Sequence, residues 1–360
     1  MAPRPWTGYR GPVTSTTAPS AARRLAPARL TPGYFAGVMA TGIVSIGAQL
    51  KGYPLLATLL FWVAVAFYLT LVVLTGWRFV SYRTHLSADF HDPARAFGFF
   101  TFIAATNVLG AALVGAGRIT LAAVLLTVSV LVWLVLGYVI PWTSVIGSDR
   151  RPMLDTANGT WFIWVVASQS IAVVAASLEP LIDGQRDQLA ILAVFAWSVG
   201  VVLYAATAVF VALRVMLYPL RPEHLDPPYW VAMGAVAITV VAGARIVEME
   251  DAPMIDVTRD LVAGMSVVFW AFATWLIPVL VAAGVWRHFL RGIPLVYQPT
   301  LWSMVFPLGM YAVAGIYLGR ADRLPVVQLI GESWFWVALL AWVLVAMGMA
   351  RDVWRALTRG

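Results

Sequence analysis

Ten apolar runs account for most of this 360-residue sequence, and they constrain its fold more than any other feature. Each run is near or above the ~20 residues that an α-helix needs to cross about 30 Å of hydrocarbon. Only 11% of the residues are charged, whereas soluble domains carry roughly a quarter. We therefore predict an all-α integral membrane protein with ten transmembrane helices, at Pro32–Gln49, Pro54–Val80, Ala94–Val114, Ile119–Ile140, Asn158–Leu178, Gln188–Leu217, Pro228–Val247, Leu261–Trp286, Thr300–Leu318 and Ser333–Met349.

Basic residues are distributed unevenly between the two sides that these helices define. With loops alternating between the sides, 17 of the 24 Lys and Arg residues fall on the side of both termini and 7 on the other. Cytoplasmic loops carry the excess of Lys and Arg in membrane proteins. The sequence thus predicts a multi-pass protein of the cell membrane with both termini in the cytoplasm. We attribute the net charge of +7 to loops that face anionic lipid, and expect no nucleic-acid partner, because no segment outside the runs is long enough for a binding domain.

The two ends of the chain differ in composition from the runs. Residues 1–30 are rich in Pro, Ala, Ser, Thr and Arg, which predicts a disordered cytoplasmic tail. Residues 31–351 are expected to form one ten-span transmembrane domain. Residues 352–360 are expected to form a short cytoplasmic C-terminal tail.

The odd-numbered runs differ in character from the even-numbered runs. Each odd run has aromatic residues at its start and small or polar residues further in, whereas the even runs are plainer. Polar side chains cost energy in lipid and tend to face a bundle interior, and small residues allow close helix packing. We therefore expect five helical hairpins, repeated in parallel, with the odd helices inside and the even helices outside. Trp230 and Trp302, at the starts of two odd runs, are interpreted as part of an interfacial aromatic belt.

A proline interrupts the ninth run directly after a phenylalanine. Pro307 has no backbone N–H and its ring clashes with the preceding turn, so it predicts a kinked helix. Broken backbone is tolerated in a membrane only where protein or water satisfies the freed groups, so this helix is expected to face the protein interior. Phe306, at the bend, either obstructs a path through the bundle or packs as one more core aromatic.

Little in the sequence suggests catalysis. It has no cysteine, no GxxxxGK[ST] phosphate loop and no HExxH motif, and its four histidines lie in or beside predicted loops. We expect no metal, no cofactor and no enzymatic activity. Asp89, Asp92 and Asp155, near the starts of the third and fifth runs, are interpreted as solvated loop charges. At the end of the seventh run, Arg245 either pairs with Glu248 three residues later or attracts anions at an outer vestibule.

Three segments resemble a known family in their order and spacing. They are Pro32–Phe35 with Gly37 and Gly42 in the first run, Asn158–Gln169 in the fifth and Trp302–Leu308 in the ninth. Together they resemble the tellurite-resistance/dicarboxylate transporter (TDT) family. This family includes bacterial tellurite-resistance proteins similar to TehA, plant slow-type (SLAC) anion channels, yeast malate permeases and sulfite exporters. The resemblance covers about residues 31–351.

The resemblance implies a fold and a function. It implies a quasi-fivefold arrangement in which the odd helices line a central pore, a homotrimer with one pore per subunit, and occlusion of the pore by Phe306 next to Pro307. We predict a passive channel or transporter for small anions: chloride, nitrate, C4-dicarboxylate, sulfite or tellurite. The odd runs contain no deeply placed carboxylate, which favours passive conduction over proton coupling. The pore-lining candidates are Thr41, Ser45, Thr101, Asn107, Thr160, Gln169, Thr239 and Ser303.

Two alternatives stay open. The first is a secondary carrier, proton-coupled or exchanging, for C4-dicarboxylate such as malate or for sulfite efflux. A pH gradient imposed across the membrane separates it from a channel, because a channel follows only the gradient of its own anion. The second is a membrane enzyme or sensor that transports nothing, for which the His and Asp residues of the cytoplasmic loops are the only candidates.

Overall fold

The computed structural model describes residues 30–147, 152–250 and 253–358, and every secondary-structure element in these ranges is a helix. Within them, ten helices are long and apolar enough to cross a membrane. The prediction of an all-α protein with ten spans is therefore confirmed. The predicted N-terminal tail lies outside the described residues, apart from Leu30.

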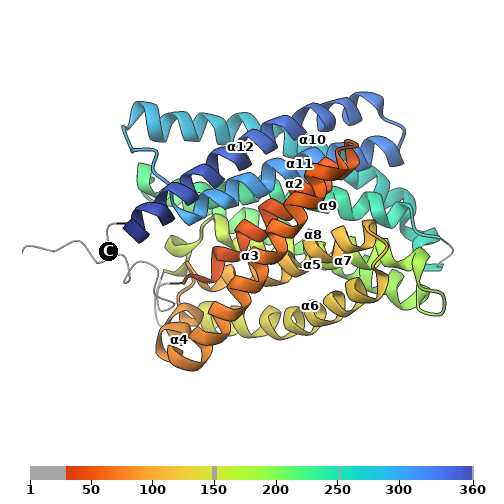
Figure 1. Cartoon of the computed structure of the whole chain (residues 1–360), viewed down its shortest axis with the longest axis horizontal. Coiled ribbons are helices and arrows are strands. Elements are labelled where there is room, and N and C mark those ends of the chain that lie inside the picture. Colours follow the sequence, from red (N-terminus) through yellow and green to blue (C-terminus); the bar gives the residue numbers. More distant parts are fainter. Residues whose placement is uncertain (1–29, 148–151, 251–252, 359–360) are drawn as a thin grey trace, which may run out of the picture.

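Along the chain, the ten membrane-length helices alternate between inner helices, which form the centre of the bundle, and outer helices, which surround it (Figure 1). The inner helices are α2 (Ala36–Leu50), α5 (Phe100–Gly115), α7 (Phe162–Leu178), α9 (Val231–Val247) and α11 (Trp302–Ala321). The outer helices are α3 (Pro54–Ser81), α6 (Ile119–Ile140), α8 (Arg186–Leu217), α10 (Pro253–Val285) and α12 (Pro325–Thr358). A short helix that was not predicted, α4 (Arg83–His91), follows α3.

Burial separates the two classes. In the most apolar stretch of each span, 72–89% of residues are buried for the inner helices and 11–44% for the outer helices. The outer helices expose large apolar side chains such as Leu59 and Trp62 on α3, as lipid-facing helices do. The prediction that odd helices lie inside and even helices outside is confirmed.

The inner helices pack in a closed ring. Helix α2 contacts α5, and the contacts continue from α5 to α7, α9 and α11 and from α11 back to α2; each inner helix also packs against the outer helix that follows it. Glycines permit the close approach. A Cβ on Gly42 would lie 2.5 Å from Cγ1 of Val108 on α5, and a Cβ on Gly309 would lie 2.7 Å from Cγ2 of Ile43 on α2. The quasi-fivefold relation between the hairpins stays a prediction.

A short 3₁₀ turn precedes each inner helix. Three of these turns begin with proline, which has no N–H to leave unpaired at a helix start. The five turns contact one another in the same cyclic order as the helices and form a second ring. They are η2 (Pro32–Phe35), η3 (Ala96–Phe99), η6 (Gly159–Trp161), η9 (Pro227–Trp230) and η11 (Pro299–Leu301).

We call the side of the bundle with this ring of turns the termini face, and the other side the opposite face. The described chain begins and ends at the termini face, on the left in Figure 1. Helix α12 continues to Thr358, so residues 352–358 of the predicted C-terminal tail are helical.

Trp302 lies in the interior of the bundle. Its side chain is only 2% exposed, and its ring centroid lies 6.5 Å from those of Phe67 on α3 and Trp342 on α12. The aromatic-belt interpretation of Trp302 is therefore wrong. An aromatic residue at the start of a span faces the interface only if that helix borders lipid, and α11 does not.

Candidate functional site

A cavity of about 990 Å³ lies between the inner helices toward the opposite face. All five inner helices contribute to its wall, and α3 and α6 add residues on one side. This volume is in the range of ligand-binding pockets, roughly 300–1,000 Å³. The wall is mostly apolar, and its polar residues are Ser45, Gln49, Thr58, Asn107, Arg118, Ser170, Ser177, Arg245, Glu248, Tyr317 and Arg320.

The cavity ends near the midpoint of every inner helix. On each helix, the lining residue closest to the helix start lies about halfway along. These residues are Ile43, Asn107, Ser170, Ile238 and Met310. The cavity is therefore a half-channel that reaches about the middle of the bundle from the opposite face.

Helix α11 presents one continuous stripe of residues to this cavity. Met310, Val313, Tyr317 and Arg320 line it, and their spacing of three or four residues places them on one helix face. Phe306 is four residues before Met310 and is thus the next residue of this stripe toward the start of the helix. Its side chain is 1% exposed.

Pro307 packs against α9. A Cβ on Gly234 would lie 2.8 Å from Cγ of Pro307, so only glycine leaves room for the proline ring at that position of α9. Pro307 has no N–H to donate to the carbonyl of Ser303, but the helix continues from Trp302 to Ala321. The kink predicted at Pro307 stays a prediction. The predicted interior position of this helix is confirmed, because 83% of the residues in its most apolar stretch are buried.

Two of the eight pore-lining candidates, Ser45 and Asn107, lie on the cavity wall. The Ser45 hydroxyl donates to the carbonyl of Ala57 on α3 at 2.7 Å. The Asn107 amide donates to Ser170 Oγ on α7 at 2.9 Å and accepts from Ser129 Oγ on α6 at 2.6 Å. These hydrogen bonds fix polar groups at the inner end of the cavity.

Three other candidates are not among the lining residues; two of them bond to outer helices and the third bonds within its own helix. Thr41 accepts a hydrogen bond at 3.0 Å from Nε1 of Trp342, which belongs to outer helix α12. Gln169 donates at 3.1 Å to the carbonyl of Trp197 on outer helix α8. The Thr239 hydroxyl donates to Ala235 in its own helix at 2.8 Å. Sequence composition marks these residues as interior, but it does not tell which side of an inner helix each one occupies.

The last three candidates lie at the termini face. The Thr101 hydroxyl is positioned to donate to the carbonyls of Gly98 and Pro32, at 2.6 and 2.8 Å, and so ties η3 to η2. The Thr160 hydroxyl is within 2.5 Å of Asn158 Oδ1 in the turn before α7. Ser303 is buried in the first turn of α11. Thr101 thus connects two turns of the ring, and Thr160 closes the turn before α7.

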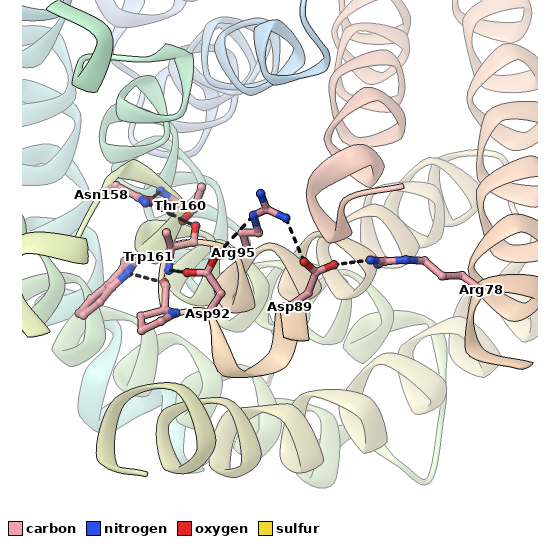
Figure 2. Close-up of polar contacts among 9 residues, drawn as sticks. Arg78, Asp89, Asp92, Arg95, Asn158, Thr160 and Trp161 are labelled. Carbon is pink, nitrogen blue, oxygen red and sulfur yellow. Dashed lines mark hydrogen bonds and ion pairs between the residues drawn. The ribbon is translucent and has the colours of Figure 1, made fainter. Parts of the chain in front are cut away.

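An ion-pair cluster with a buried Arg78–Asp89 pair anchors α4 at the termini face (Figure 2). Arg78, at the end of α3, donates to Asp89 on α4 at 2.5 Å, and both side chains are 5% exposed. Arg95 bridges Asp89 and Asp92 at 3.3 and 3.4 Å. Asp89 is therefore not a solvated loop charge, and that interpretation was wrong. Isolated loop sequence does not show that an arginine eleven residues earlier is buried beside it.

The same segment is tied to the start of α7. Nε1 of Trp161 donates to the carbonyl of Pro93 at 3.0 Å, and the Asn158 amide donates to the carbonyl of Ala94 at 3.4 Å (Figure 2). These bonds explain why the fifth run opens with Asn and Trp. The cluster thereby connects an outer helix, α4 and the ring of turns.

A second set of charged residues surrounds the start of η9. Nε of Arg214 on α8 donates to the carbonyl of Asp155 at 3.0 Å, and its Nη2 lies 3.0 Å from Nδ1 of His224. Burial raises the pKa of the neighbouring Asp226 to about 6, although the positive charge of Arg287 acts to lower it. Asp226 is thus a carboxyl group that titrates near neutral pH outside the membrane-spanning helices.

Arg245 is the best-held cation of the cavity wall. Its Nη1 donates to Glu248 at 2.8 Å and its Nη2 donates to the Tyr317 hydroxyl on α11 at 3.0 Å. The guanidinium carbon also lies 4.2 Å from the centre of the Tyr317 ring. Arg320 donates to the carbonyl of Leu50 at 3.1 Å. The sequence analysis recognised the pair with Glu248 but missed Tyr317 and Arg320. Their spacing of three and four residues along one face of α11 was the signal that could have placed them on the cavity wall.

No cation site is apparent among these groups. In the part of the chain that the structure describes, no three His, Asp or Glu side chains come close enough to hold a metal ion. The serine hydroxyls of the wall donate to backbone carbonyls, so the donors that the cavity offers are chiefly amide and guanidinium groups in an apolar wall.

In the described residues, ten membrane-length helices, five of which enclose a mostly apolar cavity with arginines near its mouth, indicate a multi-pass membrane transport protein. The chain belongs to the SLAC1 family: the family model described as "voltage-dependent anion channel" matches residues 29–350. This confirms the resemblance that the first, fifth and ninth runs indicated.

Several curated proteins are similar to the chain. An uncharacterized membrane protein of Mycobacterium tuberculosis is 60% identical over 147 residues, which are 41% of this chain and 75% of that protein. An uncharacterized transporter of Methanocaldococcus jannaschii is 24% identical and matches over 90% of this chain and 93% of its own. The sulfite efflux pump SSU1 of Trichophyton rubrum is also 24% identical, over 91% of each chain.

Proposed function

We propose that this transporter is a passive anion channel whose path runs along the axis of the five inner helices. The half-channel carries the proposal: it is lined by all five inner helices, ends near their midpoints, and stops where the next residue on the α11 stripe is Phe306. The other half of the path would pass through the ring of turns at the termini face.

Phe306 is the proposed gate. Its buried ring occupies the stripe position beyond Met310, and an anion that moves along the axis would need this ring to swing aside. Pro307 supports the movement because it removes the backbone hydrogen bond to Ser303 and thereby loosens one turn of α11. Gly234 leaves α9 without a side chain against Pro307.

The wall supports weak binding of small anions. At the inner end the Ser170 hydroxyl donates to the carbonyl of Ala167 at 2.7 Å, so the amide of Asn107 is the donor offered there, and most of the remaining wall is apolar. A conducted ion must leave as readily as it enters, so weak ligands favour flux. The anions we propose are chloride, nitrate, C4-dicarboxylate, sulfite and tellurite; the similarity to a sulfite efflux pump supports sulfite.

A proton-coupled carrier is the second candidate, and the distribution of carboxylates argues against it. Among the described residues of the cavity wall, Glu248 is the single carboxylate, and it lies at the mouth and not at the midpoint. A proton relay in a membrane needs an ionisable group along the path.

We also propose that both termini are cytoplasmic, that the protein assembles as a homotrimer in the cell membrane, and that it catalyses no reaction.

Flux in proteoliposomes tests the function. Purified protein is reconstituted, an anion gradient is imposed for each of chloride, nitrate, malate and sulfite, and flux is recorded with and without a pH gradient. A channel conducts at least one anion at a rate that the pH gradient leaves unchanged. Transport that the pH gradient drives against the anion gradient would establish the carrier instead, and no flux of any anion would overturn both.

A further inference from the structure

The parallel packing of the inner helices creates an electrostatic problem for an anion path. All five inner helices end toward the opposite face, so the negative ends of five helix dipoles surround the mouth of the cavity. An approaching anion would be repelled unless cations offset these partial charges. Three arginines line this part of the cavity, and two of them, Arg245 and Arg320, lie in the last turns of α9 and α11.

Of these arginines, Arg245 alone is held in a defined geometry by side chains of two inner helices. Tyr317 contacts the guanidinium through its hydroxyl at 3.0 Å and its ring at 4.2 Å, and Glu248 accepts from Nη1 at 2.8 Å. Side-chain exposure is 29% for Arg245 and 38% for Glu248, so both reach the cavity mouth. A guanidinium fixed by an aromatic ring keeps its planar fork oriented.

We propose that Arg245, held by Tyr317, is the oxyanion-binding site of the cavity mouth, and that an incoming anion displaces the Glu248 carboxylate from its guanidinium. This inference rests on the proposed anion transport and specifies its first binding step. The ligand class is a small oxyanion such as sulfite or a carboxylate.

The chemistry of the pair explains this preference. A guanidinium binds two oxygens of one oxyanion through parallel N–H bonds, and Glu248 already occupies the guanidinium with a ligand of that kind. Glu248 competes with the anion for Arg245: it compensates the charge of Arg245 while the site is empty. Because it also weakens anion binding, a bound anion can move on from the mouth into the cavity. The Tyr317 hydroxyl offers one further donor once it turns toward the ligand. Chloride is a single acceptor atom, so it cannot place two oxygens on the fork and gains less from it than an oxyanion does.

A purely structural role makes a different prediction. As an arginine in the last turn of α9 with a glutamate three residues later, Arg245 could serve only as a helix-terminal cation. In that case lysine would replace it, and removal of Glu248 would not tighten anion binding. The variants Arg245→Lys and Glu248→Gln therefore distinguish the two roles.

The test measures binding and flux separately. Sulfite and chloride binding are measured by the thermal stabilisation that each produces in detergent-solubilised protein, and half-saturation concentrations are measured by flux in proteoliposomes. The variants are R245Q, R245K, E248Q and Y317F. The matched control is R186Q, because Arg186 pairs with Glu250 at 3.1 Å on the same face and is not among the cavity-lining residues.

We expect R245Q to raise the half-saturation concentration for sulfite about tenfold or more, the range of a charge-assisted hydrogen bond. R245K should weaken sulfite binding but leave chloride nearly unchanged, Y317F should weaken sulfite binding severalfold, and E248Q should strengthen it severalfold. Equal sulfite binding by R245Q and R186Q, or weaker binding by E248Q, would overturn the inference. If wild-type protein binds sulfite through Arg245 but passes no anion, the proposed channel function fails and the binding site stands.

Discussion

Replacement of Asp89 by Asn should destabilise the protein strongly, because it leaves Arg78 as an unpaired buried charge. The two side chains are each 5% exposed and their N–O distance is 2.5 Å. Removal of one partner from a buried ion pair costs about 3–5 kcal/mol. Nε of Arg78 already lacks a hydrogen-bond partner among the described residues, so the uncharged Asn would face a buried guanidinium that has one donor unsatisfied from the start.

Arg95 provides the matched control for this prediction. It contacts the same carboxylate at 3.3 Å, but its side chain is 59% exposed, and exposed ion pairs contribute only about 0–1 kcal/mol. Arg95→Gln should therefore cost about 1 kcal/mol or less. The double variant R78M/D89L should recover much of the loss of D89N, because it removes both buried charges together.

The measurement is the free energy of unfolding in detergent, from denaturant titrations followed by tryptophan fluorescence. Size-exclusion chromatography confirms that each variant starts from the folded protein. If D89N and R95Q lose the same free energy within about 1 kcal/mol, the anchoring of α4 through a buried pair is refuted. A double variant less stable than D89N would contradict the charge-burial explanation specifically.

Two further predictions concern the ring of turns and its surroundings. Gly159→Ala should cost about 1–3 kcal/mol or more of unfolding free energy, because the new Cβ would lie 2.2 Å from the backbone of Pro228. Gly76→Ala is the control and should be tolerated, because its Cβ meets no atom within 4 Å. Equal stability of the two variants would contradict the close contact of η6 and η9. Asp226 has a folded-state pKa of about 6 against an ordinary 3.8, so the folded protein binds the proton of this carboxyl more tightly than the unfolded chain does. Protonated Asp226 therefore stabilises the fold by about 3 kcal/mol, and this contribution is complete below pH 3.8 and is lost as pH rises through about 6. Asp226→Asn should abolish that part of the pH dependence. The measurement is the free energy of unfolding of wild type minus that of D226N at pH 4 and at pH 7, and the same value at both pH values would contradict the prediction.

The sequence was sufficient to predict the general fold. Hydropathy placed ten spans, and the contrast between polar and plain runs separated inner from outer helices, because lipid and protein select different side chains. Boundaries were less accurate: α12 begins at Pro325 and not near Ser333, since the polar residues of its first turns do not prevent a helix from extending beyond the bilayer.

The site was predicted only in part, because composition does not define orientation about a helix axis. Ser45 and Asn107 line the cavity, whereas Thr41 and Gln169, which look equivalent in sequence, bond to outer helices. An inner helix is buried on all sides, so its hydrophobic pattern carries no stripe that would distinguish the pore from a neighbouring helix. Contacts across the chain, such as Arg245 with Tyr317 seventy-two residues later, emerge only from the fold.

Conductance of Phe306→Ala in planar lipid bilayers tests the central claim most directly. The control is Phe335→Ala: Phe335 is equally buried, at 1% exposure, but lies on outer helix α12. Each variant should lose about 3–5 kcal/mol of stability as a buried phenylalanine is truncated. We expect anion conductance per incorporated protein to rise many-fold for F306A alone. Conductance of F306A no higher than that of wild type and F335A would contradict it.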